Sequence, residues 1–218
     1  MRILLIDHLP LENLQNGEGT LRLARGLRDL AHEVACLVAD ECDGRGDDEF
    51  PVRRVLFRRD DPAADQPFAL PTFSAATPGT SNFLELSDRQ LAGYREAMWR
   101  QLDGEVVARD PQIIHAQYVG LLGHLALETG VPYVLSARGP ELQACRQDRR
   151  WRRFADEAVA GAGKVLAGDE RLRLELLELF PHAAERIAVL PPADGSPGRR
   201  IERIAAIYAA VLRERFGS

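Results

Sequence analysis

The chain has 218 residues, of which 45% are hydrophobic and 28% are charged, a composition typical of soluble globular proteins with a buried core. Its formal net charge of −5 argues against a protein that binds nucleic acid through a basic surface, so we expect no nucleic-acid partner. The apolar runs are too short to cross a bilayer, and the opening MRILLID is typical of a buried strand rather than a signal peptide. The three cysteines form no metal-binding pattern, which favours a reducing compartment. We therefore expect a cytoplasmic protein without a transmembrane segment.

Short apolar runs alternate with helical patterns along the chain, and this alternation predicts a parallel sheet covered by helices. The runs predict strands over residues 3–6, 33–39, 52–57, 113–115, 133–136, 164–167 and 186–190. Helical periodicity is expected over residues 20–31, 86–109, 120–129, 150–160 and 170–180. Residues 58–85 show no periodicity and predict a long loop. The fold class is α/β: a single Rossmann-like domain with a mostly parallel sheet of about seven strands flanked by helices.

The C-terminal segment differs from the rest of the chain. Residues 195–198 read Gly-Ser-Pro-Gly, a short flexible linker. Residues 199–216 then predict a helix with one apolar stripe, formed by Ile201, Ile204, Ala205, Tyr208, Val211 and Leu212. Because burial of such a stripe is favourable, we expect this helix to pack back on the sheet. The predicted organisation is a domain over 1–194, a linker over 195–198 and a closing helix over 199–218.

The first candidate site is the loop Asn16-Gly17-Glu18-Gly19-Thr20, which leads into the first helix. Backbone N–H groups at a helix N-terminus bind anions, and glycines let a phosphate approach closely. The same residues also suit a flexible turn in which Thr20 caps the helix.

A dehydrogenase fingerprint fits this loop badly. The third glycine is replaced by Arg22, and the glycines come ten residues after the strand instead of directly after it. Asp40, at the end of the second strand, is the only feature that favours a nicotinamide cofactor.

Two further candidates follow predicted strands, where open α/β sheets bind ligands. His115 ends one strand and can bind a sugar or a phosphate, or be a partly buried histidine paired with backbone. Arg138 and Gly139 follow the next strand, where the guanidinium can pair with an anion or lie solvated in a turn. Glu141 is a candidate base or hydroxyl-binding group.

Other chemistry finds no support in the sequence. Nucleophile-elbow, P-loop and zinc-protease motifs are missing, and the remaining histidines have no ligand spacing. We expect neither a metal site nor another cofactor. The charged stretch Arg146–Arg153 with Trp151 predicts a solvated helix face, or alternatively a contact surface for an anionic acceptor or a partner.

These loops, each behind a strand, resemble the N-terminal domain of glycogen-synthase-like glycosyltransferases (family 4, GT-B fold). The matching stretches are MRILLID…GEGTLRLARGLRDLAHEV, DPQIIHAQYVGLLGHLALETGVPYVLSARGPEL and AGAGKVLAGDERLRLELLELF…RIAVLPPADG. Arg138-Gly139 stands where many relatives have His-Gly, and Pro191–Asp194 resembles the segment that leads into the second domain.

The resemblance implies specific roles for these residues. Gly17 and Gly19 would approach the donor phosphates or the acceptor, and Arg138 would stabilise charge on the leaving phosphate. His115 would position hydroxyl groups. The family's second domain, which carries the Lys/Arg and paired-Glu motif that binds the nucleotide and the sugar, has no counterpart here, since four residues separate Asp194 from the closing helix.

Three functions follow as hypotheses. The first is the acceptor-side half of an enzyme that transfers a hexose from a nucleotide-sugar to an acceptor, completed by a separate donor-binding protein. The second is a catalytically inactive stand-alone or engineered domain that acts only as a binding module. The third, an NAD-type oxidoreductase, depends on tight NAD binding.

Overall fold

The computed structural model describes residues 1–11, 17–43, 49–73, 80–190 and 197–217. Within these residues a seven-stranded sheet runs in the order β3-β2-β1-β6-β7-β8-β9, and every neighbouring pair is parallel. The predicted α/β fold class is thus confirmed. The strands are β1 (Arg2–Asp7), β2 (Glu33–Asp40), β3 (Val52–Leu56), β6 (Ile113–Ala116), β7 (Tyr133–Ser136), β8 (Lys164–Ala167) and β9 (Ile187–Val189).

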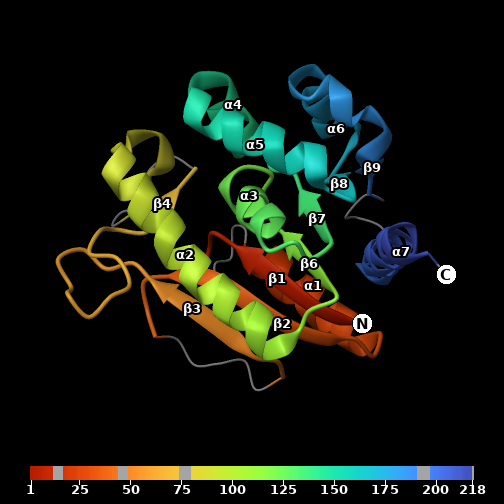
Figure 1. Cartoon of the computed structure of the whole chain (residues 1–218), viewed down its shortest axis with the longest axis horizontal. Coiled ribbons are helices and arrows are strands. Elements are labelled where there is room, and N and C mark those ends of the chain that lie inside the picture. Colours follow the sequence, from red (N-terminus) through yellow and green to blue (C-terminus); the bar gives the residue numbers. More distant parts are fainter. Residues whose placement is uncertain (12–16, 44–48, 74–79, 191–196, 218) are drawn as a thin grey trace.

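Helices cover both faces of the sheet, and alternate residues of each strand face opposite layers. Leu4 and Ile6 of β1 belong to one apolar cluster with α2, α3, α5 and α6, whereas Ile3 and Leu5 belong to another with α1 and α7. In Figure 1, α2 crosses the front of the sheet and α7 lies at its right-hand side. The helices are α1 (Gly17–Asp29), α2 (Asp88–Arg109), α3 (Leu121–Glu128), α4 (Gly139–Gln147), α5 (Arg149–Gly161), α6 (Glu170–Leu179) and α7 (Pro197–Phe216), with 3-10 turns η1 (Phe83–Glu85) and η2 (Pro181–Arg186).

The strand order reverses between β1 and β6. β1 pairs with β2 on one side and with β6 on the other, so the chain leaves the two central strands in opposite directions across the sheet. In open parallel sheets such a reversal opens a crevice at the carboxyl ends of the strands, where ligands bind. His8, which follows β1, and Gln117, which follows β6, both lie at this point.

The segment 58–85 is more ordered than its sequence predicts. It contains a short parallel pair, β4 (Pro71–Thr72) with β5 (Ser81–Asn82), and then η1. Leu70 and Phe83 are buried in the main core. The other described residues of the segment form turns and irregular backbone, as the predicted long loop requires, but its few apolar side chains pack into the core despite their irregular spacing.

Helix α7 packs on the sheet through the predicted stripe. Ile204, Tyr208 and Val211 are buried against the face that α1 also covers. Pro197 and Gly198 belong to the first turn of α7, so the helix begins two residues before the end of the predicted linker over 195–198. Residues 195 and 196 lie outside the described residues. Among the described residues, no helix combines the length and the apolar character needed to cross a membrane.

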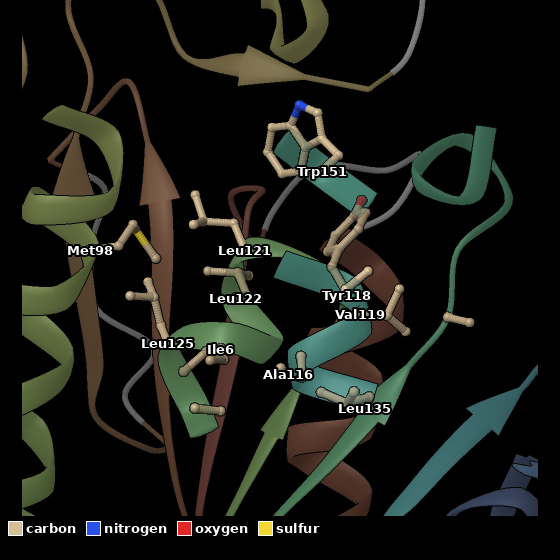
Figure 2. Close-up of a cluster of buried hydrophobic side chains, with 14 of the residues drawn as sticks. Ile6, Met98, Ala116, Tyr118, Val119, Leu121, Leu122, Leu125, Leu135 and Trp151 are labelled. Carbon is tan, nitrogen blue, oxygen red and sulfur yellow. The ribbon is translucent and has the colours of Figure 1, made fainter. Parts of the chain in front are cut away.

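The stretch Arg146–Arg153 is solvated as expected at its charged residues, of which Arg146, Arg149 and Arg153 are exposed, but not at Trp151. It spans the junction of α4 and α5, and Trp151 is completely buried among aromatic rings. Figure 2 shows the indole at the upper end of the apolar cluster, above Leu121 of α3. Arg146 forms ion pairs with Glu175 and Glu178, and these pairs connect α4 with α6.

Candidate functional site

A cavity of about 350 Å³ opens at the carboxyl ends of β6, β7 and β8. The starts of α1, α4 and α7 surround it, because each of these helices begins at the same edge of the sheet or passes beside it. Polar side chains and glycines line it: Gly19, Arg22, His115, Gln117, Ser136, Arg138, Gly139, Gly168 and Arg200. The cavity therefore combines a positive lining with backbone that a ligand can approach.

Arg138 is the central cation of this cavity. It is the N-cap residue of α4, and its Nη2 donates a hydrogen bond of 3.0 Å to Oε1 of Gln117 on the neighbouring loop. Its Nε is buried and has no hydrogen-bond partner among the described residues. A buried N–H without a partner costs free energy, so the guanidinium is arranged to bind an acceptor group that the chain itself does not supply.

A second arginine approaches the cavity from the closing helix. Nη2 of Arg200 lies 3.6 Å from the position that a Cβ on Gly168 would occupy, at the end of β8. Burial, and then the positive charge of Arg138, lower the pKa of Arg200, while Asp169 opposes this effect. Two guanidinium groups that repel each other across one cavity favour an anion between them.

The start of α4 adds backbone donors to the same place. Its N-cap makes no side-chain capping bond, and a Cβ added to Gly139 would meet nothing within 4 Å. Pro140 has no N–H and the Leu142 N–H bonds to the carbonyl of Arg138, so Gly139 and Glu141 carry the remaining donors of the first turn. Gly139 lines the cavity, and the helix dipole favours negative charge there. Gly19 of α1 completes this edge, since a Cβ there would lie 3.8 Å from Nη2 of Arg138.

His115 lines the cavity but is held entirely by the protein. Its Nδ1 lies 2.5 Å from the hydroxyl of Tyr208 on α7, and its Nε2 lies 2.8 Å from Oγ of Ser136. The ring is fully buried, and burial, followed by the charge of Arg138, lowers its pKa to about 3. A neutral imidazole with both nitrogens paired positions Ser136 and joins α7 to the cavity.

Thr20 does not cap α1, contrary to the expectation from sequence. The helix begins at Gly17, and the buried Thr20 hydroxyl instead donates to Oδ2 of Asp7 at the end of β1. Burial raises the pKa of Asp7 to about 6, although the Thr20 bond and the charge of Arg138 oppose this. The pair fixes the start of α1 relative to β1.

The buried carboxylate of Glu141 fixes the loop between β6 and α3 by two hydrogen bonds. One carboxylate oxygen accepts from the N–H of Val119 at 2.8 Å and the other from the N–H of Gly120 at 2.7 Å. A Cβ on Gly120 would lie 2.7 Å from Oε1, so this close approach requires glycine. The side chain is fully buried, and burial raises its pKa to about 8.

The structure brings five of the predicted site residues to one edge of the sheet. His115, Arg138, Gly139 and Gly19 line the cavity, and Thr20 lies just beneath the start of α1. Glu141 lies behind the cavity lining. Gly17 and Glu18 form the first turn of α1, but their side chains are outside the described part of the structure, as are Asn16 and Pro191–Asp194. The roles assigned to these residues stay predictions.

Sequence reasoning missed several residues of the site. Asp7 ends β1 and His8 follows it. Gln117 and Ser136 belong to the polar lining, and Arg200 comes from the closing helix. Asp7 and His8 could have been found from the sequence, because they stand at the end of the predicted first strand. No sequence signal links Arg200 to Arg138, because only the docking of α7 brings them together.

Four buried groups predict how stability depends on pH. Asp7 and Glu141 have pKa values raised to about 6 and about 8, from 3.8 and 4.5. Those of His8 and His115 are lowered from 6.5 to about 3. A raised acid loses stability as pH rises through this interval, whereas a lowered histidine gains it.

Between pH 4.5 and 6 the stability lost through the two acids offsets the stability gained through the two histidines. Above pH 6.5, Glu141 is the one group of these four that still titrates. The free energy of unfolding should therefore peak near pH 6.5 and fall by about 2 kcal/mol toward pH 8. Urea unfolding across this range measures it. A free energy that keeps rising up to pH 8 would show that Glu141 is ionised at neutral pH.

A match to a protein-family model covers residues 17–193, and its description is "Glycosyl transferase 4-like domain". The chain belongs to this family. The match includes the strands β2 to β9 and all of the cavity except α7. In the described residues no group of three or more His, Cys, Asp or Glu is placed to hold a metal ion. No curated protein matches the sequence.

Solved structures place the glycosyl transferase 4-like domain among known folds. Sucrose-phosphate synthase from Thermosynechococcus elongatus superposes with a TM-score of 0.62 at 10% identity, over 88% of this chain and 48% of that one. Anabaena HepE in complex with UDP and glucose gives 0.53 at 17% identity, over 100% and 50%. The chain thus spans about half the length of these proteins, and identities this low support the fold alone.

A second form of the Thermosynechococcus enzyme matches over its whole length. This form, labelled 27_220_406_426, gives a TM-score of 0.59 at 12% identity and covers 100% of both chains. The sheet domain and the closing helix therefore have a counterpart of the same extent among solved structures.

Proposed function

We propose that this chain is the acceptor-side half of a hexosyltransferase and that the cavity at Arg138 receives the diphosphate of a nucleotide-sugar. The observation that carries the proposal is the convergence of Arg138, Arg200 and the uncapped start of α4 on one cavity at the strand ends. Family membership supplies the class of reaction. HepE was solved with UDP and glucose, which is the ligand chemistry that such a cavity suits.

In the proposed reaction, the bond between the sugar carbon and the diphosphate oxygen breaks, and a bond to the acceptor oxygen forms. The diphosphate leaves with the bonding electron pair, and the proton of the acceptor hydroxyl passes to an oxygen of this leaving diphosphate. Arg138 and the N–H groups of α4 stabilise the negative charge that develops on the leaving diphosphate. Gln117 holds the guanidinium toward the cavity, and His115 holds Ser136 beside it.

The proposal also includes a separate donor-binding domain. The sheet domain and the closing helix α7 together match 48% of the sucrose-phosphate synthase chain. The nucleotide and sugar contacts of the other half would come from a second polypeptide. Mixing the two chains should restore sugar transfer that neither shows alone.

The form labelled 27_220_406_426 favours one alternative. It matches this chain over 100% of both chains, so a chain of this extent, without a second half, exists as a separate folded unit. A chain of this kind would be catalytically inactive and act only as a binding module. Such a module would have little affinity for nucleotide-sugars, since most donor contacts would be missing.

Calorimetry with UDP, UDP-glucose and pyrophosphate distinguishes the two functions. We expect all three to bind, and R138Q to weaken binding about tenfold or more, because a charge-assisted hydrogen bond is lost. R200Q should weaken it as well. The matched control is R203Q, which changes an exposed arginine on the same helix and should leave affinity unchanged. If none of the three ligands binds at millimolar concentration, the binding-module alternative stands instead.

A further inference from the structure

A second, smaller cavity lies on the other side of Arg138 and Gly139. Its volume is about 240 Å³, and these two residues also line the larger cavity. The remaining wall includes His8 after β1, Thr72 and Phe73 from the segment 58–85, Phe83, and Tyr118 after β6. A ligand here would lie directly beside one bound at Arg138.

Aromatic rings surround His8 in this wall. The ring centroids of Tyr118, Phe83 and Phe73 lie 4.7, 4.8 and 5.7 Å from the imidazole centroid, and that of Tyr94 lies at 5.5 Å. Trp151 extends the cluster, with its ring 4.9 Å from Phe73 and 5.0 Å from Phe83. Figure 2 shows Trp151 and Tyr118 at the same end of the apolar cluster. Such surroundings favour a flat apolar ring, and an apolar cavity of about 150 Å³ is enough to bind benzene.

One polar atom in this wall has no partner. His8 is 1% exposed, its Nδ1 lies 2.6 Å from the hydroxyl of Tyr94, and its Nε2 has no hydrogen bond among the described residues. Burial lowers the pKa of His8 to about 3, so the ring is neutral. In one tautomer Nε2 donates and in the other it accepts. A ligand hydroxyl can pair with either.

We propose that this cavity binds the acceptor, an aromatic alcohol whose ring packs among Phe73, Phe83 and Tyr118 and whose hydroxyl pairs with Nε2 of His8. This inference rests on the proposed function. A sugar acceptor fits less well, because each of its several hydroxyls needs a partner and the side chains of Leu9, Phe73 and Phe83 offer none. The carboxylate of Asp7, the residue before His8, already accepts from Thr20 and from the backbone of Leu9.

Small probes test the proposal without knowledge of the natural acceptor. Calorimetry compares p-cresol with p-xylene, which replaces the hydroxyl by a methyl group, and with methyl glucoside. We expect p-cresol to bind about tenfold more tightly than p-xylene, the worth of one hydrogen bond, and methyl glucoside not to compete. Binding should shift the indole N–H signal of Trp151 in nuclear magnetic resonance, which W99F assigns because the chain has two tryptophans.

H8F tests the hydroxyl partner. It should bind p-cresol and p-xylene equally, while Y133F, which changes a buried tyrosine hydroxyl bonded to Ala158, should keep the tenfold preference. Should H8F fail to fold, the wild-type comparison decides alone. Equal affinities in the wild type, no binding of either aromatic probe, or methyl glucoside as the tightest ligand would each overturn the proposal. UDP binding measured in parallel separates this failure from failure of the proposed function, which concerns the other cavity.

Discussion

Replacing Glu141 by alanine is expected to lower the free energy of unfolding by about 2 to 4 kcal/mol, because two buried N–H groups lose their acceptor. These N–H groups belong to Val119 and Gly120, in the loop that also carries Gln117. Since Gln117 accepts from Arg138, the variant should also bind UDP more weakly than the wild type. Urea unfolding followed by circular dichroism measures the first effect and calorimetry the second.

The matched control for this substitution is Q143A, which changes an exposed residue two positions along the same helix. Its free energy of unfolding should stay within about 0.5 kcal/mol of the wild type. The variant E141A should also lose the decline in stability between pH 6.5 and 8. If E141A is as stable as Q143A, the carboxylate does not hold the loop, and a direct role for Glu141 with substrate gains weight.

Replacing Trp151 by alanine should cost about 3 to 5 kcal/mol of unfolding free energy, as expected for a fully buried aromatic side chain. The indole connects α5 with Phe73 and Phe83 in edge-on contacts, and a Cβ on Gly120 would lie 3.3 Å from its Cε3. Its loss therefore opens a void between α5, the segment 58–85 and the loop before α3. Denaturant unfolding is the measurement.

Two other variants define what the Trp151 result means. W99A removes a partly exposed indole from α2 and should cost less than half as much. W151F keeps an aromatic ring and removes an N–H group that has no partner among the described residues, so it should recover most of the loss. A W151A protein as stable as W99A would contradict the packing described above.

The sheet could be predicted from sequence because its strands are buried on both faces and read as unbroken apolar runs. Helix α7 was predictable for a similar reason, since its stripe is regular. Helix α4 was missed because Gly139-Pro140 suggested a turn, although proline is favoured in the first turn of a helix. Trp151 was misread because arginines flank it, yet Trp151, Ala155, Ala158 and Val159 have helical spacing and are all buried.

The site was only partly predictable, for a different reason. His115 lies near the end of β6, Arg138 follows β7 and Gly19 lies in the first turn of α1. The ends of strands and the starts of helices are visible in sequence. The aromatic cavity is not visible, because its rings come from β4, η1 and the loop after β6 and meet only in the fold. Arg200 likewise reaches Arg138 only through the docking of α7. Local patterns thus predicted the strand ends but not the side chains that gather there from distant segments.

Arg138 and Gly139 form the boundary between the two cavities. With a diphosphate on one side and an aromatic hydroxyl on the other, the sugar carbon would lie within reach of both the leaving oxygen and the attacking oxygen, as transfer requires. The most direct test is a crystal structure of this chain with UDP. We predict the diphosphate within hydrogen-bonding distance of Arg138 and the first N–H groups of α4. A diphosphate bound elsewhere, or an empty cavity at saturating UDP, would contradict the account.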